Sequence, residues 1–360
     1  MNKKPTPRER FLNAINFQKP VDRLPMIEWA DWWDKTYHRW QIDGLPEDLT
    51  RENLVSYFGL DEMACIIAIT RGGGLPAPAY HGAPIIDAGN LNTSVETSNK
   101  ASIETLNKAS IEASYEAIRP MLFTDDCLRW TIEQGKRLAG NHKEGNIIVR
   151  LWLDGFFWFP RSLFGIENHL YAFYDYPELL HRMCRDLADY NRRVMDALFE
   201  IIEPDMVGFA EDMSYNHGPM LSHEQFREFL LPYYKELVPY INQHNITAWV
   251  DTDGDVVPLI PWLLEAGIQG IYPLERQAGV DVSEIRRRYP KLLMMGAFDK
   301  MVMSKGENEI RAEFERLLPV MRSGGFIVSM DHQTPPETPL ENYRIYLAIY
   351  EEYCRHAVSS

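Results

Sequence analysis

Short apolar runs alternate with longer amphipathic stretches through most of the chain. Eight of the apolar runs have the length of strands, at 23–30, 61–70, 146–154, 205–212, 248–253, 270–275, 292–299 and 325–332. Helical periodicity marks the stretches at 167–202, 223–244, 256–266, 282–288, 307–323 and 339–356. Buried strands that alternate with helices predict a parallel sheet covered on both faces. Eight such strands favour a closed (β/α)8 TIM barrel over an open, doubly wound α/β sheet.

Two segments depart from this alternation. Thr6-Pro7-Arg8-Glu9 combines a capping residue with proline at the first helical position, so we expect a helix that ends before Pro20. Farther along, the octet at 97–104 recurs at 105–112 with seven of eight residues identical. Its alternating polar and apolar residues predict a small β-hairpin or meander. We therefore expect one barrel domain over 1–360, with an N-terminal helical extension and a repeat-containing β-type insertion at 83–115.

The composition narrows the class of protein. The chain has 52 acidic and 37 basic residues, a formal net charge of −15, and such a surface repels phosphate backbones. Its four cysteines form no CxxC pair, which is typical of a reducing compartment. The polar N-terminus is unlike a signal peptide, and no run reaches the ~18 apolar residues of a membrane helix. We expect a cytoplasmic globular protein that binds neither nucleic acid nor membranes.

Acidic residues gather where the predicted strands end. They are Glu28, Asp154, Glu211, Asp212, Asp251, Asp253, Glu275, Asp299 and Asp331, the last followed by His332. Because strand carboxyl ends converge on the active site of a barrel, we expect these side chains to share one cavity. They cannot all ionise there without a counter-charge. A bound cation, raised pKa values suited to acid–base chemistry, or a cationic substrate would resolve this. The nearest basic residues are Arg150, Arg161 and Lys300.

The residue types suggest roles. Candidate catalytic residues are Glu211, Asp253 and His332. Asp251, Asp253 and His332 also combine oxygen and nitrogen donors that suit zinc or another divalent metal. In the alternative, Asp331 or Asp251 orients His332, which transfers a proton. Tryptophans cluster after two of the strands and favour a pocket for a flat organic ligand. The candidate substrate-binding residues are Glu28, Trp32, Trp33, Trp152, Asp212, Tyr215 and Glu275.

Several motifs together resemble the uroporphyrinogen decarboxylase superfamily. They are PRERFLNAINFQKP at 7–20, DRLP at 22–25, EDMSYNHGP at 211–219, FLLP at 229–232, Asp253-Gly254 and PPETPLEN at 335–342. The resemblance covers the chain apart from the repeat. It implies a (β/α)8 barrel with its cleft at the strand carboxyl ends, and it allows a homodimer. The superfamily includes decarboxylases that use no cofactor and methyltransferases that act with corrinoid proteins.

The resemblance also allows the chain to be compared with the decarboxylases and with the methyltransferases of the superfamily. True uroporphyrinogen decarboxylases carry Arg-Gln-Ala-Gly-Arg after the first strand, where the arginines hold substrate carboxylates, but this chain has WADWWDK at 29–35. An acidic, tryptophan-rich mouth is poorly built for a polycarboxylate. The methyltransferases present His-x-Cys-Gly, whose ligands hold zinc and activate a thiol, at the place of Asp251-Thr-Asp253-Gly254. Oxygen donors there suit a Lewis acid that polarises an ether oxygen.

We therefore expect a methyltransferase that moves a methyl group between a small, methoxylated aromatic donor and a corrinoid protein. Two alternatives stay open. One is a cofactor-free decarboxylase, a lyase acting on uroporphyrinogen or a related tetrapyrrole, with Asp253 or Glu211 as the acid–base group and no metal. The other is a non-catalytic protein that binds a corrinoid or tetrapyrrole.

Overall fold

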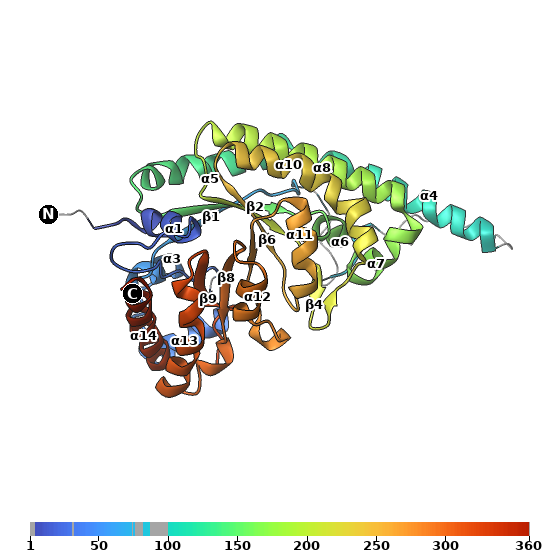
Figure 1. The fold of residues 1–360 in the computed structure, drawn as a ribbon. Coiled ribbons are helices and arrows are strands. Elements are labelled where there is room, and N and C mark those ends of the chain that lie inside the picture. The colour runs from blue at the N-terminus through green and yellow to red at the C-terminus, as the bar shows by residue number, and fades with distance from the viewer. Residues whose placement is uncertain (1–3, 31, 74, 76–81, 87–99, 360) are drawn as a thin grey trace.

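A curled sheet of seven parallel strands forms the centre of the molecule (Figure 1). The computed structural model describes residues 4–30, 32–73, 75, 82–86 and 100–359. The strand order is β1-β2-β3-β6-β7-β8-β9, so each strand pairs with the next along the chain. The strands are β1 (Met63–Ile67), β2 (Ile148–Asp154), β3 (Met206–Ala210), β6 (Thr247–Asp251), β7 (Gly270–Tyr272), β8 (Leu293–Phe298) and β9 (Phe326–Met330). Seven of the eight predicted strands are thus confirmed.

Three helices precede β1 and others follow the strands, and most of the helices cover the outside of the sheet. They are α1 (Pro7–Ile15), α2 (Asp34–Ile42), α3 (Arg51–Tyr57), α4 (Lys100–Ile118), α5 (Asp125–Lys143), α6 (Trp158–Phe164), α7 (Ile166–Asp175), α8 (Pro177–Phe199), α9 (His223–Gln225), α10 (Leu231–Gln243), α11 (Ile260–Ala266), α12 (Val282–Arg288), α13 (Glu307–Arg322) and α14 (Leu340–Val358). A short hairpin of β4 (Ser214–Tyr215) and β5 (Gly218–Pro219) follows β3. No helix in the described part of the chain is long and apolar enough to cross a membrane.

The segment before α2 lies between β9 and the start of β1 without becoming a strand. Residues 23–30 belong to no strand, so the prediction of a strand there is wrong. The Asp61 N–H donates to the Met26 carbonyl oxygen (2.7 Å), and the Trp29 N–H donates to a serine hydroxyl of β9 (3.3 Å). Pro25 has no N–H to contribute to a ladder. The strands therefore form a TIM-barrel-like half-barrel, whereas the sequence predicted a closed (β/α)8 barrel.

The predicted N-terminal helix is confirmed as α1, with the expected cap. Thr6 Oγ1 accepts a hydrogen bond from the Glu9 N–H (3.2 Å), and the Glu9 carboxylate accepts one from the Thr6 N–H (2.7 Å). Pro7 occupies the first helical position, where no N–H is needed. This reciprocal capping box satisfies two amide groups that the helix itself leaves unpaired.

The predicted β-type insertion is wrong where the structure describes it. Residues 83–86 form no strand, and α4 covers the second copy of the repeat and projects beyond the body of the molecule (Figure 1). Residues 87–99 lie outside the described residues. Ile111, Tyr115 and Ile118 are buried in the core at helical spacings of four and three. This periodicity extends past the repeat, and packing of these side chains outweighed the alternation inside it.

Candidate functional site

A cavity of about 820 Å³ opens where the strands of the half-barrel end, and it reaches down beside β1. Seven of the predicted site residues line it: Glu28, Trp32, Trp152, Asp212, Asp251, Asp253 and His332. Four others, Glu211, Glu275, Trp33 and Tyr215, are not among its lining residues. The strand-end pattern therefore located a shared cavity, but it did not separate cavity residues from structural ones.

Asp251 and Asp253 place two carboxyl groups at the end of β6. Both line the cavity. Burial raises the pKa of Asp251 well above its usual range, and the nearby Asp253 carboxylate raises it further. Burial also raises the pKa of Asp253 to about 7, together with the negative charges of Glu275 and Asp212, while the Lys300 ammonium opposes the rise. Near neutral pH, this pair therefore carries protons that ordinary aspartates have lost.

Glu28 is a third carboxyl group with a high proton affinity. Its Oε2 accepts a hydrogen bond from Ser329 Oγ (3.0 Å), and its Oε1 accepts one from the Tyr346 hydroxyl (3.0 Å). Burial nevertheless raises the pKa of Glu28 to about 7, because these bonds only partly offset the loss of solvent. The cavity wall thus contains a carboxyl group that is held by neutral donors alone among the residues described.

His332 lines the cavity, and its surroundings favour the neutral imidazole. Burial lowers the pKa of His332, and the Lys300 ammonium lowers it further. The edge of its ring faces Trp29, with ring centroids 6.1 Å apart. Asp331, one of its predicted orienting partners, uses its two oxygens for the backbone N–H groups of Arg276 (2.9 Å) and Lys300 (3.2 Å). The structure therefore does not support the prediction that Asp331 orients the imidazole.

Asp212 and Glu275 act on the cavity through their charges. Asp212 lines it and has a φ of +44°, a left-handed backbone rarely found outside glycine. Arg161 Nη1 donates to its carboxylate at 2.7 Å. Glu275 lies behind the wall, where its carboxylate accepts a hydrogen bond from the Gly254 N–H (2.9 Å) and pairs with Lys300 (3.4 Å). Both carboxylates favour protonation of the neighbouring Asp253.

The carboxylate of Glu211 is held by hydrogen bonds from the surrounding chain. Its side chain is fully buried, and its oxygens accept hydrogen bonds from the N–H groups of Phe156 (2.8 Å), Phe157 (2.7 Å) and Trp158 (3.2 Å). The Tyr234 hydroxyl donates to it as well. These contacts satisfy amide groups at the start of α6, which a helix leaves unpaired. The geometry thus gives Glu211 a capping role and does not support its predicted catalytic role.

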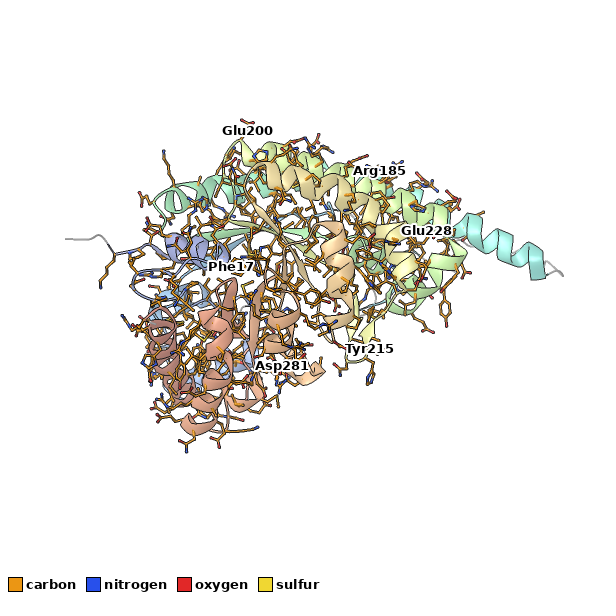
Figure 2. The ribbon with its side chains drawn as sticks, in the orientation of Figure 1. Phe17, Arg185, Glu200, Tyr215, Glu228 and Asp281 are labelled. Carbon is orange, nitrogen blue, oxygen red and sulfur yellow. The ribbon has the colours of Figure 1, made fainter. Side chains whose placement is uncertain are left out.

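The tryptophans also divide into two groups. Trp29, Trp32 and Trp152 line the cavity, and the Trp32 indole N–H donates to the Tyr343 hydroxyl (3.2 Å). Trp33 is 42 % exposed and lies outside the cavity wall. Tyr215, also predicted to bind substrate, is 50 % exposed at the β4–β5 hairpin, at the periphery of the molecule (Figure 2). The cavity therefore has indole walls, but two of the predicted aromatic contacts are surface residues.

Arg150 is a cavity residue whose importance the sequence did not reveal. Its guanidinium group lies over the Trp152 ring, 4.5 Å from the centroid, and the residue is only 8 % exposed. From the sequence, Arg150 was only one of three nearby basic residues, because its place inside the cavity depends on how the strand packs. Its position opposite Cys65 of β1 depends on the register of the sheet. Arg150 and Trp152 are two residues apart and therefore lie on the same face of the strand. This spacing was the signal in the sequence that could have placed Arg150 in the cavity.

The predicted metal ligands do not meet as a metal-binding group in the described residues. Across the residues that the structure describes, no group of three or more His, Cys, Asp or Glu side chains is arranged to hold a metal ion. Asp251, Asp253 and His332 line one cavity without meeting as such a group. A metal site at these residues stays a prediction, and the proposed chemistry uses the carboxyl groups themselves.

Comparisons with known proteins give a family match and distant similarities to solved structures. The family model for uroporphyrinogen decarboxylase (URO-D) matches residues 160–353, more than half of the chain. No curated protein matches the chain. The structure is similar to one described as a vitamin-B12 independent methionine synthase from Listeria monocytogenes, with 10% identity and a TM-score of 0.40 over 93% of this chain and 98% of that chain. It is also similar to a sugar phosphate isomerase/epimerase from Parabacteroides distasonis, with 10% identity and a TM-score of 0.30 over 83% and 89%.

Proposed function

Because this chain belongs to the uroporphyrinogen decarboxylase family, which includes decarboxylases and methyltransferases, we propose that it is a methyltransferase. The proposed reaction moves a methyl group from a small, methoxylated aromatic donor to a corrinoid held by a partner protein. One observation carries the proposal: a cavity of about 820 Å³ combines indole walls with carboxyl groups that remain protonated near neutral pH.

The size and walls of the cavity suit a small aromatic donor. Ligand pockets of ~300–1,000 Å³ enclose most of the surface of a small organic molecule. Trp29 and Trp152 offer flat apolar surfaces to an aromatic ring, and aromatic pairs gain energy beyond the burial of area. The lowered pKa of His332 favours its neutral form, which places no additional positive charge beside the donor. These features support an uncharged reacting group, such as an ether.

The proposed chemistry is protonation of the leaving oxygen. When the methyl group of an aryl methyl ether moves to an acceptor, the C–O bond breaks and its electron pair stays on the phenolic oxygen. Asp253, with a pKa of about 7, donates a proton to that oxygen as it leaves. A corrinoid supplies the nucleophile that accepts the methyl group. Asp251, the more strongly protonated neighbour, keeps a second negative charge away from the reacting bond.

The scarcity of cations in the cavity disfavours the decarboxylase alternative. Its lining contains six carboxyl side chains and two guanidinium groups, contributed by Glu28, Asp61, Glu62, Asp212, Asp251 and Asp253 and by Arg51 and Arg150. Uroporphyrinogen is a polycarboxylate, and each of its carboxylates needs a cation or several hydrogen-bond donors inside a protein. A donor with few or no negative charges matches this lining better.

Methyl transfer to free cob(I)alamin tests the proposal. We would incubate the purified chain with chemically reduced cobalamin and a panel of methoxylated aromatics, and follow methylcobalamin by absorbance and the phenol by chromatography. Parallel samples would contain uroporphyrinogen and be analysed for decarboxylated porphyrins. We expect stoichiometric methylcobalamin and phenol from at least one ether, and no porphyrin product. Porphyrin decarboxylation without methyl transfer would establish the alternative and refute the proposal.

A further inference from the structure

Arg150 places one positive charge deep in the cavity. It is the third residue of β2, and its register partners are Cys65 in β1 and Met206 in β3. Asp154, at the end of the same strand, lies four residues farther on, which corresponds to about 13 Å along a strand. Cys65 and Trp152, whose side chains also line the cavity, lie on the same inward face. Asp212, Asp251 and Asp253 thus lie toward the mouth of the cavity, whereas Arg150 lies lower, as do Asp61 and Glu62 beside the start of β1.

This guanidinium group has unused hydrogen-bonding capacity. Its Nε and Nη1 atoms are buried and have no hydrogen-bond partner among the described residues. The Tyr272 hydroxyl is also buried, and it lies beside Arg150 without a hydrogen bond of good geometry to it or to another described residue. Unpaired buried donors are costly, and a buried cation with unpaired donors is more so. Two neighbouring groups with this deficit indicate a ligand that would complete them.

No carboxylate among the described residues forms an ion pair with Arg150. Asp251 interacts with it electrostatically, but the described residues include no ion pair between the two within 4.0 Å. Burial and the proximity of Asp253 favour the protonated, neutral form of Asp251. The planar guanidinium fork of Arg150 thus keeps unpaired donors that match the two oxygens of a carboxylate.

We propose that Arg150 binds a single carboxylate of the methyl donor, with Tyr272 as a second hydrogen-bond donor to the same group. The substrate class is then an aromatic monocarboxylate whose carboxylate faces Arg150 and whose methoxy group faces Asp253 at the mouth. This identity of the substrate rests on the proposed function, whereas the carboxylate site rests on the geometry around Arg150 alone. A single cation selects one negative charge, which separates this donor from a polycarboxylate.

A binding experiment tests the site without any methyl acceptor. Isothermal titration calorimetry would compare 4-methoxybenzoate with 4-methoxybenzamide, which has nearly the same shape and no charge. We expect the wild-type chain to bind the acid at least about tenfold more tightly, the scale of one charge-assisted bidentate contact. Equal affinity for the two compounds would overturn the proposal, and this comparison requires no variant. Sodium sulfate serves as a third probe, and binding of sulfate in preference to the benzoate would also contradict an aromatic carboxylate site.

Variants assign the preference to Arg150. Arg150→Gln should abolish the discrimination between acid and amide, and Arg150→Lys should retain part of it, because an ammonium group keeps the charge but not the bidentate geometry. Arg51→Gln is the matched control: Arg51 also lines the cavity, but its side chain is 43 % exposed and already paired with Asp34 (2.5 Å). We expect that control to keep the wild-type preference. Loss of the preference in Arg51→Gln and its retention in Arg150→Gln would show that Arg51 binds the carboxylate, and it would contradict the proposal.

Different results would refute the methyltransferase proposal and the carboxylate-site proposal. Selective binding of 4-methoxybenzoate without methyl transfer to cob(I)alamin would preserve the carboxylate site and refute the methyltransferase. Methyl transfer from neutral ethers, with no preference for the acid, would preserve the methyltransferase and refute the carboxylate site.

Discussion

Glu211 and Asp253 follow neighbouring strands, β3 and β6, and burial raises the pKa of each to about 7. Their surroundings differ in one respect. The Glu211 carboxylate receives hydrogen bonds from three backbone N–H groups and from Tyr234. The carboxyl group of Asp253 receives none from the described part of the chain and faces the cavity. A strand-end position and a raised pKa are therefore shared by a structural and a candidate catalytic carboxyl group, and hydrogen-bond saturation distinguishes them.

Asp253→Asn tests the catalytic role of Asp253 and should have the largest effect of the substitutions considered. Asparagine has the shape and neutrality of a protonated aspartate, but it cannot supply a comparable acidic proton. We expect kcat for methyl transfer to fall by roughly 10²–10⁴-fold, the usual contribution of a general acid. The thermal unfolding midpoint, measured by circular dichroism, should stay close to that of the wild-type chain. Activity within a few-fold of wild type would remove Asp253 from the chemistry.

The opposite outcome is expected for Glu211→Ala. This change leaves the N–H groups of Phe156, Phe157 and Trp158 without their acceptor in a buried site. We expect the free energy of unfolding, measured by urea denaturation, to fall by about 3 kcal/mol or more, because each unpaired buried group costs on the order of 1–3 kcal/mol. Glu211→Gln, which retains an acceptor oxygen, should lose less. A variant that is as stable as wild type but inactive would return Glu211 to the catalytic residues.

Glu28 extends the comparison to the pH dependence of the free energy of unfolding. Its pKa is about 7 in the folded chain, against a usual value of 4.5, so the folded state binds more protons between these values. Stability from this group is therefore present below pH 4.5 and is lost as pH rises through 7. Glu28→Gln should flatten that decline, by roughly 2–3 kcal/mol between pH 5 and 8. Urea denaturation at both pH values measures it, and an unchanged slope would show that Glu28 titrates normally.

The smallest effects should follow changes at the two exposed aromatics. Trp33→Ala and Tyr215→Ala remove side chains that do not line the cavity. We expect stability to change by at most about 0.5 kcal/mol, as for most surface substitutions, and KM to stay within about twofold of wild type. Trp152→Ala, inside the cavity, is the matched comparison and should raise KM substantially. A large rise in KM for Trp33→Ala would show that the substrate extends beyond the cavity.

Much of the fold was predictable because burial on both faces makes parallel strands continuous apolar runs. Seven strands and the capped helix α1 were recognised in this way. The strand over 23–30 was predicted on the same grounds, but it lacks a ladder and contains Pro25. The predicted helix at 167–202 is divided into α7 and α8, because Pro177 disfavours helical geometry at Tyr176. Local hydrophobicity reveals burial, whereas strand pairing depends on partners far away in the chain.

The site was predictable as a region rather than as a set of roles. The chain's topology brings strand ends together, so Asp251, Asp253 and His332 were correctly expected in one cavity. The saturation of Glu211 was not predictable, because its partners are backbone amides some 50 positions earlier in the chain. The unpaired state of Arg150 was equally hidden, since a missing partner leaves no pattern in a sequence. Hydrogen-bond geometry supplied both distinctions.

The pH dependence of methyl transfer tests the central claim most directly. If protonated Asp253 assists the leaving oxygen, kcat/KM in the wild-type chain should be constant below pH about 6 and fall as pH rises through 7, approaching tenfold per pH unit. The residual activity of Asp253→Asn should lack this decline. A wild-type rate that is level or rising between pH 6 and 8.5 would contradict the claim that a protonated carboxyl group in this cavity performs the chemistry.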